Sequence, residues 1–361
     1  MSNQDRVLIA GAGPVGMIAG YYLAKHNIPV TIFESLAGTA TDHRASTVHP
    51  STLDALTELD MTSEMISRGL ISPVFQFRDR YDDRIVAEFD YGLIADETDH
   101  PFALQVEQHK VIDIARTHAE AFDDFTLMRP FEVTDVAQDD DGVEVTVRAP
   151  DGTVETHRGR YLIGADGGRS IVRKALGIDF PGFTWGERFV IATTKFDFGT
   201  PEAGNHRYRN YVAHPDQWCA LIKVAGDDMT GLWRILLPAS GDESDEEVGG
   251  EEWVQRKYAE CLPYNPPYEI VHRNLYNVHQ RVADNFVQYA ADKGVHPAML
   301  AVAWVMGHPG ITAPIIGGRN LDQLAPSLAA LDFEMSAEMR AEISALSVEP
   351  PPATDRAETQ A

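Results

Sequence analysis

The feature that most constrains this fold is the stretch 6–34, in which an apolar run leads into three closely spaced glycines. Gly11, Gly13 and Gly16 have the spacing G-x-G-x-x-G, and apolar residues at helical spacing follow them. This order predicts a strand, a tight turn and a helix. Gly11 would allow the turn, Gly13 the close approach of a pyrophosphate to the backbone, and Gly16 the close packing of helix on sheet.

The residues after this predicted helix strengthen the interpretation. Asn27 and Pro29 end the helix, and the apolar residues 30–33 predict a second strand that is followed at once by Glu34. A carboxylate about 20 residues after the glycines is placed to accept hydrogen bonds from a ribose diol, while the free N–H groups of the helix face phosphates. A glycine turn in another α/β protein is the alternative; the complete pattern favours dinucleotide binding.

Composition excludes several classes of function. The chain has 361 residues, a net charge of -25 and a pI of about 4.8, whereas nucleic-acid binding needs clustered Lys and Arg. Cys219 and Cys261 are the only cysteines, so no disulfide framework and no zinc spacing is expected. No apolar run approaches the roughly 18 residues of a membrane span. We therefore expect a soluble, cytoplasmic protein that holds no metal and could form a homo-oligomer.

The next part of the chain alternates between helical and strand patterns. Apolar periodicity predicts helices over 51–66 and 101–121, with Gln105 near the start of the second. Short strands are expected over 73–91, and a β-meander over 131–163. The polar loop after Glu34 contains Arg44, and the acidic run 241–252 is expected to be a solvated loop.

A second informative stretch is YLIGADGGRSIVRKALG, residues 161–177. It predicts a strand that runs into Asp166-Gly167-Gly168 and then a short helix closed by Gly177. An acidic residue at the carboxyl end of a strand can meet a cofactor that lies over the sheet edge. It can equally cap the helix in an ordinary Asp-Gly turn. Spacing alone leaves both interpretations open.

Over about residues 5–286 the chain resembles the group A FAD-dependent aromatic hydroxylases, which include para-hydroxybenzoate and phenol hydroxylases. The resemblance rests on GAGPVG with Glu34, on HRAST, on ALQVEQ and on GADGGRSIVRKALG. It implies an α/β fold with a Rossmann-like FAD-binding domain and a β-sheet substrate domain. It also implies that NAD(P)H reduces the flavin and that O₂ then hydroxylates a phenolic or related aromatic. The implied FAD contacts are Gly11, Gly13, Pro14, Val15, Gly16, Glu34, Arg44, Gln105, Asp166 and Gly167.

The residues of the expected substrate domain fit one large sheet. The stretches 188–198, 217–225 and 231–239 alternate and are rich in aromatic residues. Four aromatic residues could line an apolar pocket over a flavin, although core packing is favoured for each: Tyr208, Tyr211, Trp218 and Trp233. His272 and His279 are expected to be structural, and no side chain is identified as catalytic.

After residue 286 the resemblance changes. The family continues with a strand that ends in Gly-Asp and holds the ribityl chain, but residues 287–348 instead resemble the end of an aldo-keto reductase barrel. There Gly317 and Arg319 would contact the 2′-phosphate of NADPH, and Gln323 would be a further contact. Ser327 stands where that family has an adenine-reading Asn. The reductase's catalytic Asp, Tyr, Lys and His belong to earlier barrel strands, which this sequence does not hold.

These observations predict a four-part organisation and one primary function. The FAD-binding domain is expected over 1–72 and 101–179, the substrate domain over 73–100 and 180–286, a partial (β/α) barrel over 287–348, and a disordered tail over 349–361. The tail should hold helices over 297–306, 321–331 and 337–346, the last capped by Ser336, and a strand over 313–316. The primary hypothesis is a monooxygenase impaired by the missing Gly-Asp segment. The alternatives are a non-catalytic, nucleotide-binding fusion and, less favoured, an NADPH-dependent reductase.

Overall fold

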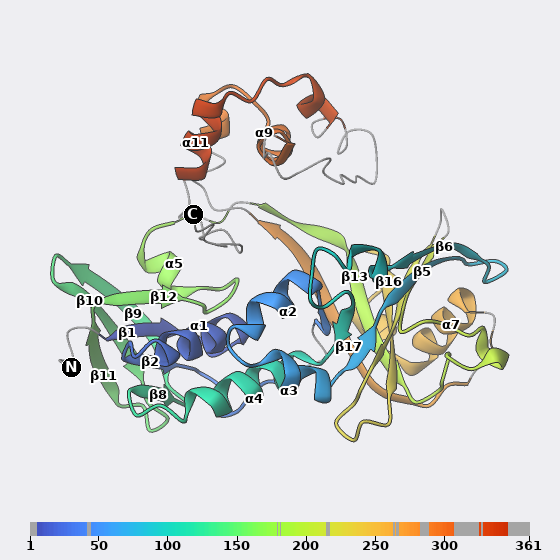
Figure 1. Ribbon diagram of the computed structural model, residues 1–361, viewed down its shortest axis with the longest axis horizontal. Helices are drawn as coiled ribbons and strands as arrows, with labels where there is room; N and C mark the ends of the chain where they lie inside the picture. Colours follow the sequence, from blue (N-terminus) through green and yellow to red (C-terminus); the bar gives the residue numbers. More distant parts are fainter. Residues whose placement is uncertain are drawn as a thin grey trace, which may run out of the picture. The chain divides into compact units, whose positions relative to one another are not determined.

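The computed structural model describes residues 6–41, 45–178, 180, 182–213, 217–262, 264, 267–281, 289–306, 325 and 328–345. The chain divides into two compact units (Figure 1). Unit 1 comprises residues 1–176 and 184–278, and unit 2 comprises 177–183 and 279–361. The two units are described separately below.

Four short parallel strands form the centre of the first half of unit 1, in the order β12-β1-β2-β8. They are β1 (Val7–Ala10), β2 (Val30–Phe33), β8 (Phe125–Met128) and β12 (Tyr161–Gly164). Val7 and Ile9 of β1 pack into the core on one face of the sheet, whereas Leu8 and Ala10 pack into the core on the other. Both faces of this strand are therefore buried, as its continuous apolar run requires.

Helices cover the first of these faces. They are α1 (Pro14–Lys25), α2 (Pro50–Thr57), α3 (Thr62–Ser67) and α4 (Gln108–Ala119). Met17 and Tyr21 of α1 belong to the same buried cluster as Ile114 and Ala115 of α4. The single helix predicted over 51–66 is wrong, because the chain turns between α2 and α3 at Asp60, which has a φ of 57°.

A small antiparallel sheet has the strand order β3-β7-β4 and contains Gln105. Its strands alternate along the chain with helices α2, α3 and α4. Its strands are β3 (Thr47–Val48), β4 (Leu70–Ser72) and β7 (Ala103–Gln105). The predicted helix over 101–121 therefore starts later than expected. Gln105 ends a strand and pairs with Thr47 and Leu70, and α4 begins only at Gln108.

The expected meander covers the second face of the parallel sheet. Its antiparallel strands are β9 (Glu132–Asp139), β10 (Gly142–Arg148) and β11 (Val154–Gly159). Val143, Val145 and Val147 alternate along β10 and pack against Leu8 and Phe33. The last strand predicted for the meander is β12, which instead pairs in parallel with β1, and α5 (Ile171–Ala175) follows it.

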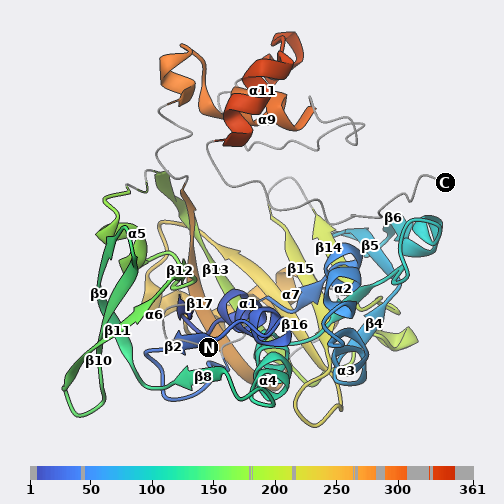
Figure 2. The same ribbon diagram turned by 60° about the vertical axis from the view of Figure 1, so that its left-hand side comes forward.

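The second half of unit 1 is built on a seven-stranded sheet of order β17-β13-β16-β15-β14-β5-β6. This sheet and the meander lie at opposite ends of unit 1 (Figures 1 and 2). The strands are β5 (Val74–Asp79), β6 (Ile85–Asp90), β13 (Gly182–Thr194), β14 (Arg209–Ala213), β15 (Cys219–Val224), β16 (Leu232–Ala239) and β17 (Ile270–Arg281). The 3-10 turns η2 (Tyr91–Ile94) and η3 (Pro201–Ala203) and the helices α6 (Asp245–Val248) and α7 (Glu251–Cys261) accompany them.

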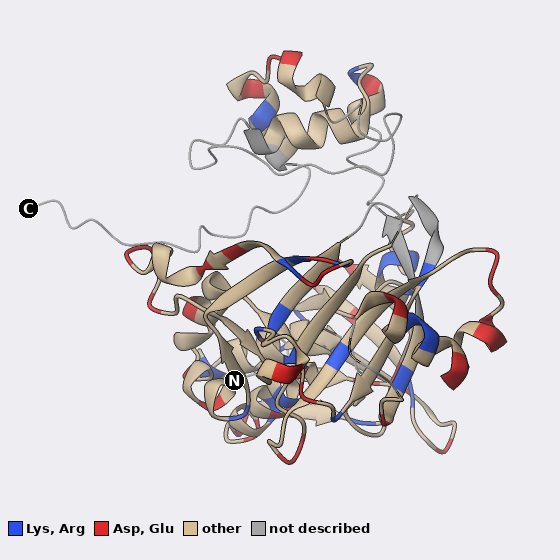
Figure 3. Cartoon of the chain, turned by 90° about the vertical axis from the view of Figure 1, so that its right-hand side faces the viewer, with Lys and Arg blue, Asp and Glu red and all other residues tan. Residues whose placement is uncertain are grey.

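Helix α7 covers one face of this sheet. Trp253 and Tyr258 of α7 pack in the same buried cluster as Trp233 and Leu221 of the sheet. The acidic run 241–252, which was expected to be a loop, contains the short helix α6. The Ser244 hydroxyl caps this helix by accepting a hydrogen bond of 3.2 Å from the Glu247 N–H. Acidic residues in general are spread over loops and helix ends (Figure 3).

A buried polar cluster joins the β5–β6 hairpin to the rest of this sheet. Asp83 Oδ2 lies 2.6 Å from Arg78 Nη1 and accepts a hydrogen bond of 2.6 Å from the Tyr264 hydroxyl. His206 Nε2 lies 3.3 Å from Asp83 Oδ1. Burial raises the pKa of Asp83, but the hydrogen bonds from His206, Tyr264 and Arg78 and the charge of His206 outweigh it and leave that pKa below its usual value.

We expect Asp83→Asn to change how stability depends on pH. Because the folded-state pKa of Asp83 is lowered, its contribution is fully present above the unfolded-state pKa of about 3.9 and is lost as pH falls through the folded-state pKa. The variant should lose about 2 kcal/mol near neutral pH and less at acid pH. Urea unfolding of both proteins between pH 7 and pH 3 measures this difference in the free energy of unfolding. A difference that stays the same over this pH range would contradict the prediction.

Unit 2 takes in the first two residues of β13 and the last three of β17, and its described part after residue 288 is helical. It holds α9 (Pro297–Met306), the 3-10 turn η4 (Ala329–Asp332) and α11 (Ala337–Ala345). Leu300 and Ile343 share a small core, and the Ser336 hydroxyl accepts a hydrogen bond of 3.0 Å from the Met339 N–H, so the predicted cap is confirmed. The predicted strand 313–316 and tail 349–361, and most of the predicted helix 321–331, lie outside the described residues.

The described residues contain neither a membrane-spanning helix nor a cluster of metal-binding side chains. None of their helices has the length and apolar character that crossing a membrane requires. Within the same residues, no three His, Cys, Asp or Glu side chains gather as they would around a metal ion.

Candidate functional site

The carboxyl ends of three parallel strands meet at one edge of the first sheet. β1 lies between β12 and β2 and pairs with both in parallel. The residues that follow these strands are therefore neighbours: the Gly11 N–H donates to the Phe33 carbonyl at 2.8 Å, and the Ala165 N–H to the Ala10 carbonyl at 2.8 Å. The glycine loop, Glu34 and Asp166 are brought to the edge where ligands bind in open α/β sheets.

The glycines of the loop differ in what requires them. Gly11 has a φ of 97°, and a Cβ there would lie 2.5 Å from the Ala165 carbonyl oxygen. A Cβ at Gly16 would lie 1.9 Å from the Gly11 carbonyl oxygen. A Cβ at Gly13 would meet nothing within 4 Å. The fold thus explains Gly11 and Gly16, whereas Gly13 borders open space that a ligand could use.

The start of α1 is shaped for an anion. Pro14 occupies its first turn, where a missing N–H costs nothing, and no side chain caps the helix. Val15, the next residue, is 68% exposed. The unsatisfied N–H groups and the helix dipole favour a phosphate at this position.

Glu34 turns its carboxylate toward the glycine loop. Its Oε2 accepts a hydrogen bond of 2.8 Å from the Ala12 N–H, and its Oε1 accepts one of 2.9 Å from the Leu36 N–H. The carboxylate is thereby held at the end of β2 beside the loop, where a ribose diol of a bound dinucleotide would lie.

Gln105 and Asp166 each keep one buried polar atom without a partner among the described residues. Gln105 is fully buried, and its Oε1 accepts a 3.0 Å bond from the Thr47 hydroxyl while its Nε2 has none. Asp166 Oδ2 caps α5 by accepting from the N–H groups of Ile171 at 2.6 Å and Val172 at 3.2 Å, but Oδ1 has no partner. Buried polar atoms are normally hydrogen-bonded, so both point to a ligand.

Asp166 therefore supports both interpretations that the sequence left open. One oxygen caps the helix and the other is available to a cofactor. Gly167, next in the chain, has a φ of 77°, and a Cβ there would meet nothing within 4 Å. Arg44, Gly317, Arg319 and Gln323 lie outside the described residues. The cofactor role of every one of these residues stays a prediction, although the described ones fit FAD.

A pocket of about 200 Å³ opens between the start of α4 and the seven-stranded sheet. Tyr208, Tyr211, Trp218 and Trp233 do not line it. Trp233 is fully buried, and its indole N–H donates to Asp197 Oδ1 at 2.8 Å, so the favoured core interpretation holds for this residue. The lining residues are Thr41, Glu107, His109, Gly226, Asp227, Leu232, Arg234 and His272.

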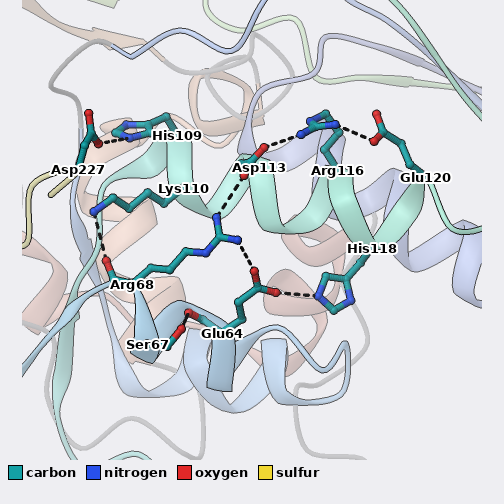
Figure 4. A network of polar contacts seen from close by, with 10 residues as sticks. All are labelled: Glu64, Ser67, Arg68, His109, Lys110, Asp113, Arg116, His118, Glu120 and Asp227. Atoms are coloured by element: carbon teal, nitrogen blue, oxygen red, sulfur yellow. Dashed lines mark hydrogen bonds and ion pairs between the residues drawn. The ribbon is translucent and has the colours of Figure 1, made fainter. Parts of the chain in front are cut away.

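Charged side chains fasten α4 to α3 and to the loop between β15 and β16 (Figure 4). Lys110 Nζ donates to the carbonyls of Gly226 at 2.7 Å and Arg68 at 3.2 Å. Arg68 in turn pairs with Glu64 of α3 and with Asp113 of α4. Because α4 begins three residues after Gln105, this network fixes the position of Gln105 relative to the pocket.

Three buried charged residues of this region were not identified from the sequence. Glu107 and Lys110 form an ion pair of 2.9 Å whose side chains are only 4% and 10% exposed. Arg234 lines the pocket from β16, in the apolar run LWRILLP. A single charged residue inside an otherwise apolar strand is the sequence feature that could have identified Arg234. His272, which was expected to be structural, also lines the pocket.

Comparison with known proteins agrees with this geometry. A para-nitrophenol 4-monooxygenase of a Pseudomonas species is 31% identical over 291 residues, which is 79% of this chain and 69% of that protein. A 6-hydroxy-3-succinoylpyridine 3-monooxygenase of Pseudomonas putida is 29% identical over 287 residues, 79% of this chain and 70% of that protein. The crystal structure of a p-nitrophenol 4-monooxygenase from Pseudomonas putida superposes with a TM-score of 0.70 at 29% identity, covering 77% of this chain and 68% of that one.

The fold, the site and these relatives define a flavoprotein of the monooxygenase class, an FAD-dependent oxidoreductase. By its match over residues 4–289, the chain belongs to the FAD binding domain family. Residues 239–348 match the aldo/keto reductase family. Both resemblances seen in the sequence are thus confirmed. The two matches overlap over 239–289, so the exact boundary near residue 286 stays a prediction.

Proposed function

We propose that this chain binds FAD and uses NAD(P)H and O₂ to hydroxylate a phenolic or related small aromatic molecule. The observation that carries the proposal is the convergence of the glycine loop, Glu34 and Asp166 at one sheet edge, with buried polar atoms of Asp166 and Gln105 left without described partners. Two relatives support the substrate class, since their names specify a nitrophenol and a hydroxylated pyridine.

The described residues divide the work of holding the cofactor. The glycine loop and the start of α1 would bind the pyrophosphate, and Glu34 the adenosine ribose. The amide of Gln105 and the free oxygen of Asp166 would hold the flavin half, together with Arg44. FAD supplies the redox chemistry when bound, and the protein orients the ring and excludes water.

We further propose that the flavin is held weakly and that hydroxylation is uncoupled or absent. The family's Gly-Asp segment would hold the ribityl chain, but residues 287–348 carry the other family's sequence instead. The domain boundaries at 72/73, 100/101, 179/180 and 286/287, a cytoplasmic location and homo-oligomer formation belong to the same proposal.

The visible absorption spectrum of the purified full chain, recorded before and after FAD addition and desalting, tests the function. A flavin band that persists, followed by aromatic-stimulated NAD(P)H oxidation, is the result expected of a monooxygenase. Full, tightly coupled turnover would overturn the impairment. A protein that cannot be reconstituted would overturn FAD binding.

Glu34→Gln is expected to weaken FAD binding at a small cost in stability, since the amide can accept from only one of the Ala12 and Leu36 N–H groups. The amide keeps an oxygen for the Ala12 N–H but loses the charge that strengthens bonds to the ribose hydroxyls. We expect a loss of about 1.5 kcal/mol, roughly tenfold in Kd, measured by FAD titration. The exposed Glu58→Gln is the matched control. An unchanged Kd for the Glu34 variant would remove Glu34 from the site.

The second candidate is a non-catalytic fusion that retains nucleotide binding, which the aldo/keto reductase match favours. Under that hypothesis the chain binds adenine nucleotides but shows no aromatic-stimulated oxidation. An NADPH site at Gly317, Arg319 and Gln323 would add NADPH binding that survives Glu34→Gln, and carbonyl reduction is not expected.

A further inference from the structure

The pocket between α4 and the seven-stranded sheet has the size of one aromatic ring. Its volume is about 200 Å³, and an engineered cavity of about 150 Å³ holds benzene. It is formed by parts of the chain that are distant in sequence: the loop after β2, the start of α4, the β15–β16 loop, and strands β16 and β17. A small substituted ring would fit this pocket.

Arg234 is the distinctive residue of this pocket. It is 7% exposed, and its guanidinium makes no hydrogen bond or ion pair with any residue that the structure describes. Burial lowers the pKa of Arg234, although nearby Glu107 and Asp227 partly oppose this. A buried guanidinium has five N–H donors and no means of losing its charge at ordinary pH, so leaving it unpaired destabilises the protein.

The neighbouring carboxylates are bound to other groups. Glu107 accepts a 2.8 Å bond from the Gly226 N–H and pairs with Lys110. Asp227 Oδ1 lies 3.2 Å from His109 Nε2 (Figure 4). The positive end of α4 is also at the pocket, and no side chain caps it. The donors of Arg234 therefore remain available to a ligand.

A second buried arginine in the same row of the sheet shows what a partnered guanidinium looks like. Arg209 pairs across the sheet with Ile222, and Ile222 with Arg234, so the three side chains share one face. Arg209 lies 4.4 Å from the centre of the Phe75 ring and donates to the Tyr91 hydroxyl at 3.0 Å. Arg209 Nε also has no partner, but the rest of its guanidinium contacts Phe75 and Tyr91, whereas no described residue makes such a contact with Arg234.

We propose that this pocket binds the oxyanion of an ionised phenol or of a carboxylated aromatic, and that Arg234 is the residue that selects the charged ligand. This rests on the proposed function in one respect only, that the bound ring is the substrate. A charge-assisted, bidentate contact between guanidinium and oxyanion would satisfy the unused donors. Neutral rings of the same shape would lack it.

The test compares 4-nitrophenolate with its neutral methyl ether, 4-nitroanisole, by calorimetric titration of the purified full chain at a pH where the phenol is ionised. Wild type is expected to bind the anion at least tenfold more tightly. Arg234→Met should lose about 10- to 100-fold in affinity for the anion with little change for the ether, and Arg234→Lys should lose less. Benzoate and benzamide distinguish a carboxylate from a phenolate.

The melting temperature of Arg234→Met and the control variant Arg209→Met show whether Arg234 binds the ligand or only stabilises the fold. Because Arg234→Met removes an unpaired buried charge, its Tm should equal or exceed that of wild type. Arg209→Met should keep the preference for the anion. Equal binding of both wild-type ligands, a preference that survives Arg234→Met, or its loss in Arg209→Met would overturn the assignment.

Titrations with and without FAD keep this proposal distinct from the proposed function. A preference for the anion in a chain that never takes up FAD would support the pocket and contradict the flavin function. FAD uptake with no preference for the anion would support the flavin function and contradict the assignment of the pocket. Displacement of the anion by FAD would show that the pocket belongs to the flavin and would also overturn the proposal.

Discussion

Gly16→Ala is expected to destabilise the first half of unit 1 strongly. The added Cβ would lie 1.9 Å from the Gly11 carbonyl oxygen, and backbone cannot move aside as a flexible side chain can. Overpacking of this kind costs about 3 kcal/mol or more, which lowers Tm by roughly 6–12 °C in a domain of 150–250 residues. Thermal unfolding followed by circular dichroism measures the effect.

Gly13→Ala is the matched control, with the same chemical change three residues earlier. Its Cβ would meet no protein atom within 4 Å, so Tm should stay close to that of wild type. If a pyrophosphate approaches here, FAD affinity should nevertheless fall by tenfold or more. Wild-type melting of Gly16→Ala would contradict the packing argument, and wild-type FAD affinity of Gly13→Ala would contradict the site.

The second large effect is expected from Lys110→Met. Lys110 is paired with buried Glu107 at 2.9 Å and donates to the Gly226 and Arg68 carbonyls. Removing one member of a buried ion pair leaves the other charge uncompensated, at a cost of about 3–5 kcal/mol. Urea unfolding should report this loss. The substitution should also loosen the attachment of α4 to the β15–β16 loop. This would be measured as faster hydrogen exchange of the Gly226 amide.

An exposed pair of the same kind provides the control. Arg148 and Glu132 lie 3.0 Å apart with side chains 54% and 55% exposed, so Arg148→Met should cost less than about 1 kcal/mol. If both variants lost equal stability, burial would not be the reason for the importance of the Lys110 pair.

The fold was predictable where local chemistry decided it. The G-x-G-x-x-G spacing with Glu34 specified β1, α1 and β2, and the alternating stretches specified strands β13, β15 and β16. The helix expected over 51–66 was wrong because the apolar spacing continues through a turn whose Asp60 adopts a positive φ. Gln105 was assigned to a helix because a short buried strand and the start of a helix have the same apolar pattern.

The site was predictable only in part, for a related reason. The sequence identified the residues that follow β1, β2 and β12, because parallel strands bring such residues to one edge. It could not identify Arg234 or the Glu107 pair, whose meaning depends on which strands and helices face each other. Burial and the lack of a described partner are tertiary properties, and spacing does not encode them.

The order of the seven-stranded sheet has a consequence for how the chain folds. Strands β5 and β6 come from the middle of the first half of the sequence, yet β5 pairs in parallel with β14, bringing Gln76 beside Asn210. The chain therefore passes between the two halves of unit 1 several times. Contacts of such high sequence separation slow folding. Neither half is a continuous segment, so a single cut anywhere between β5 and β12 would be expected to divide both halves together.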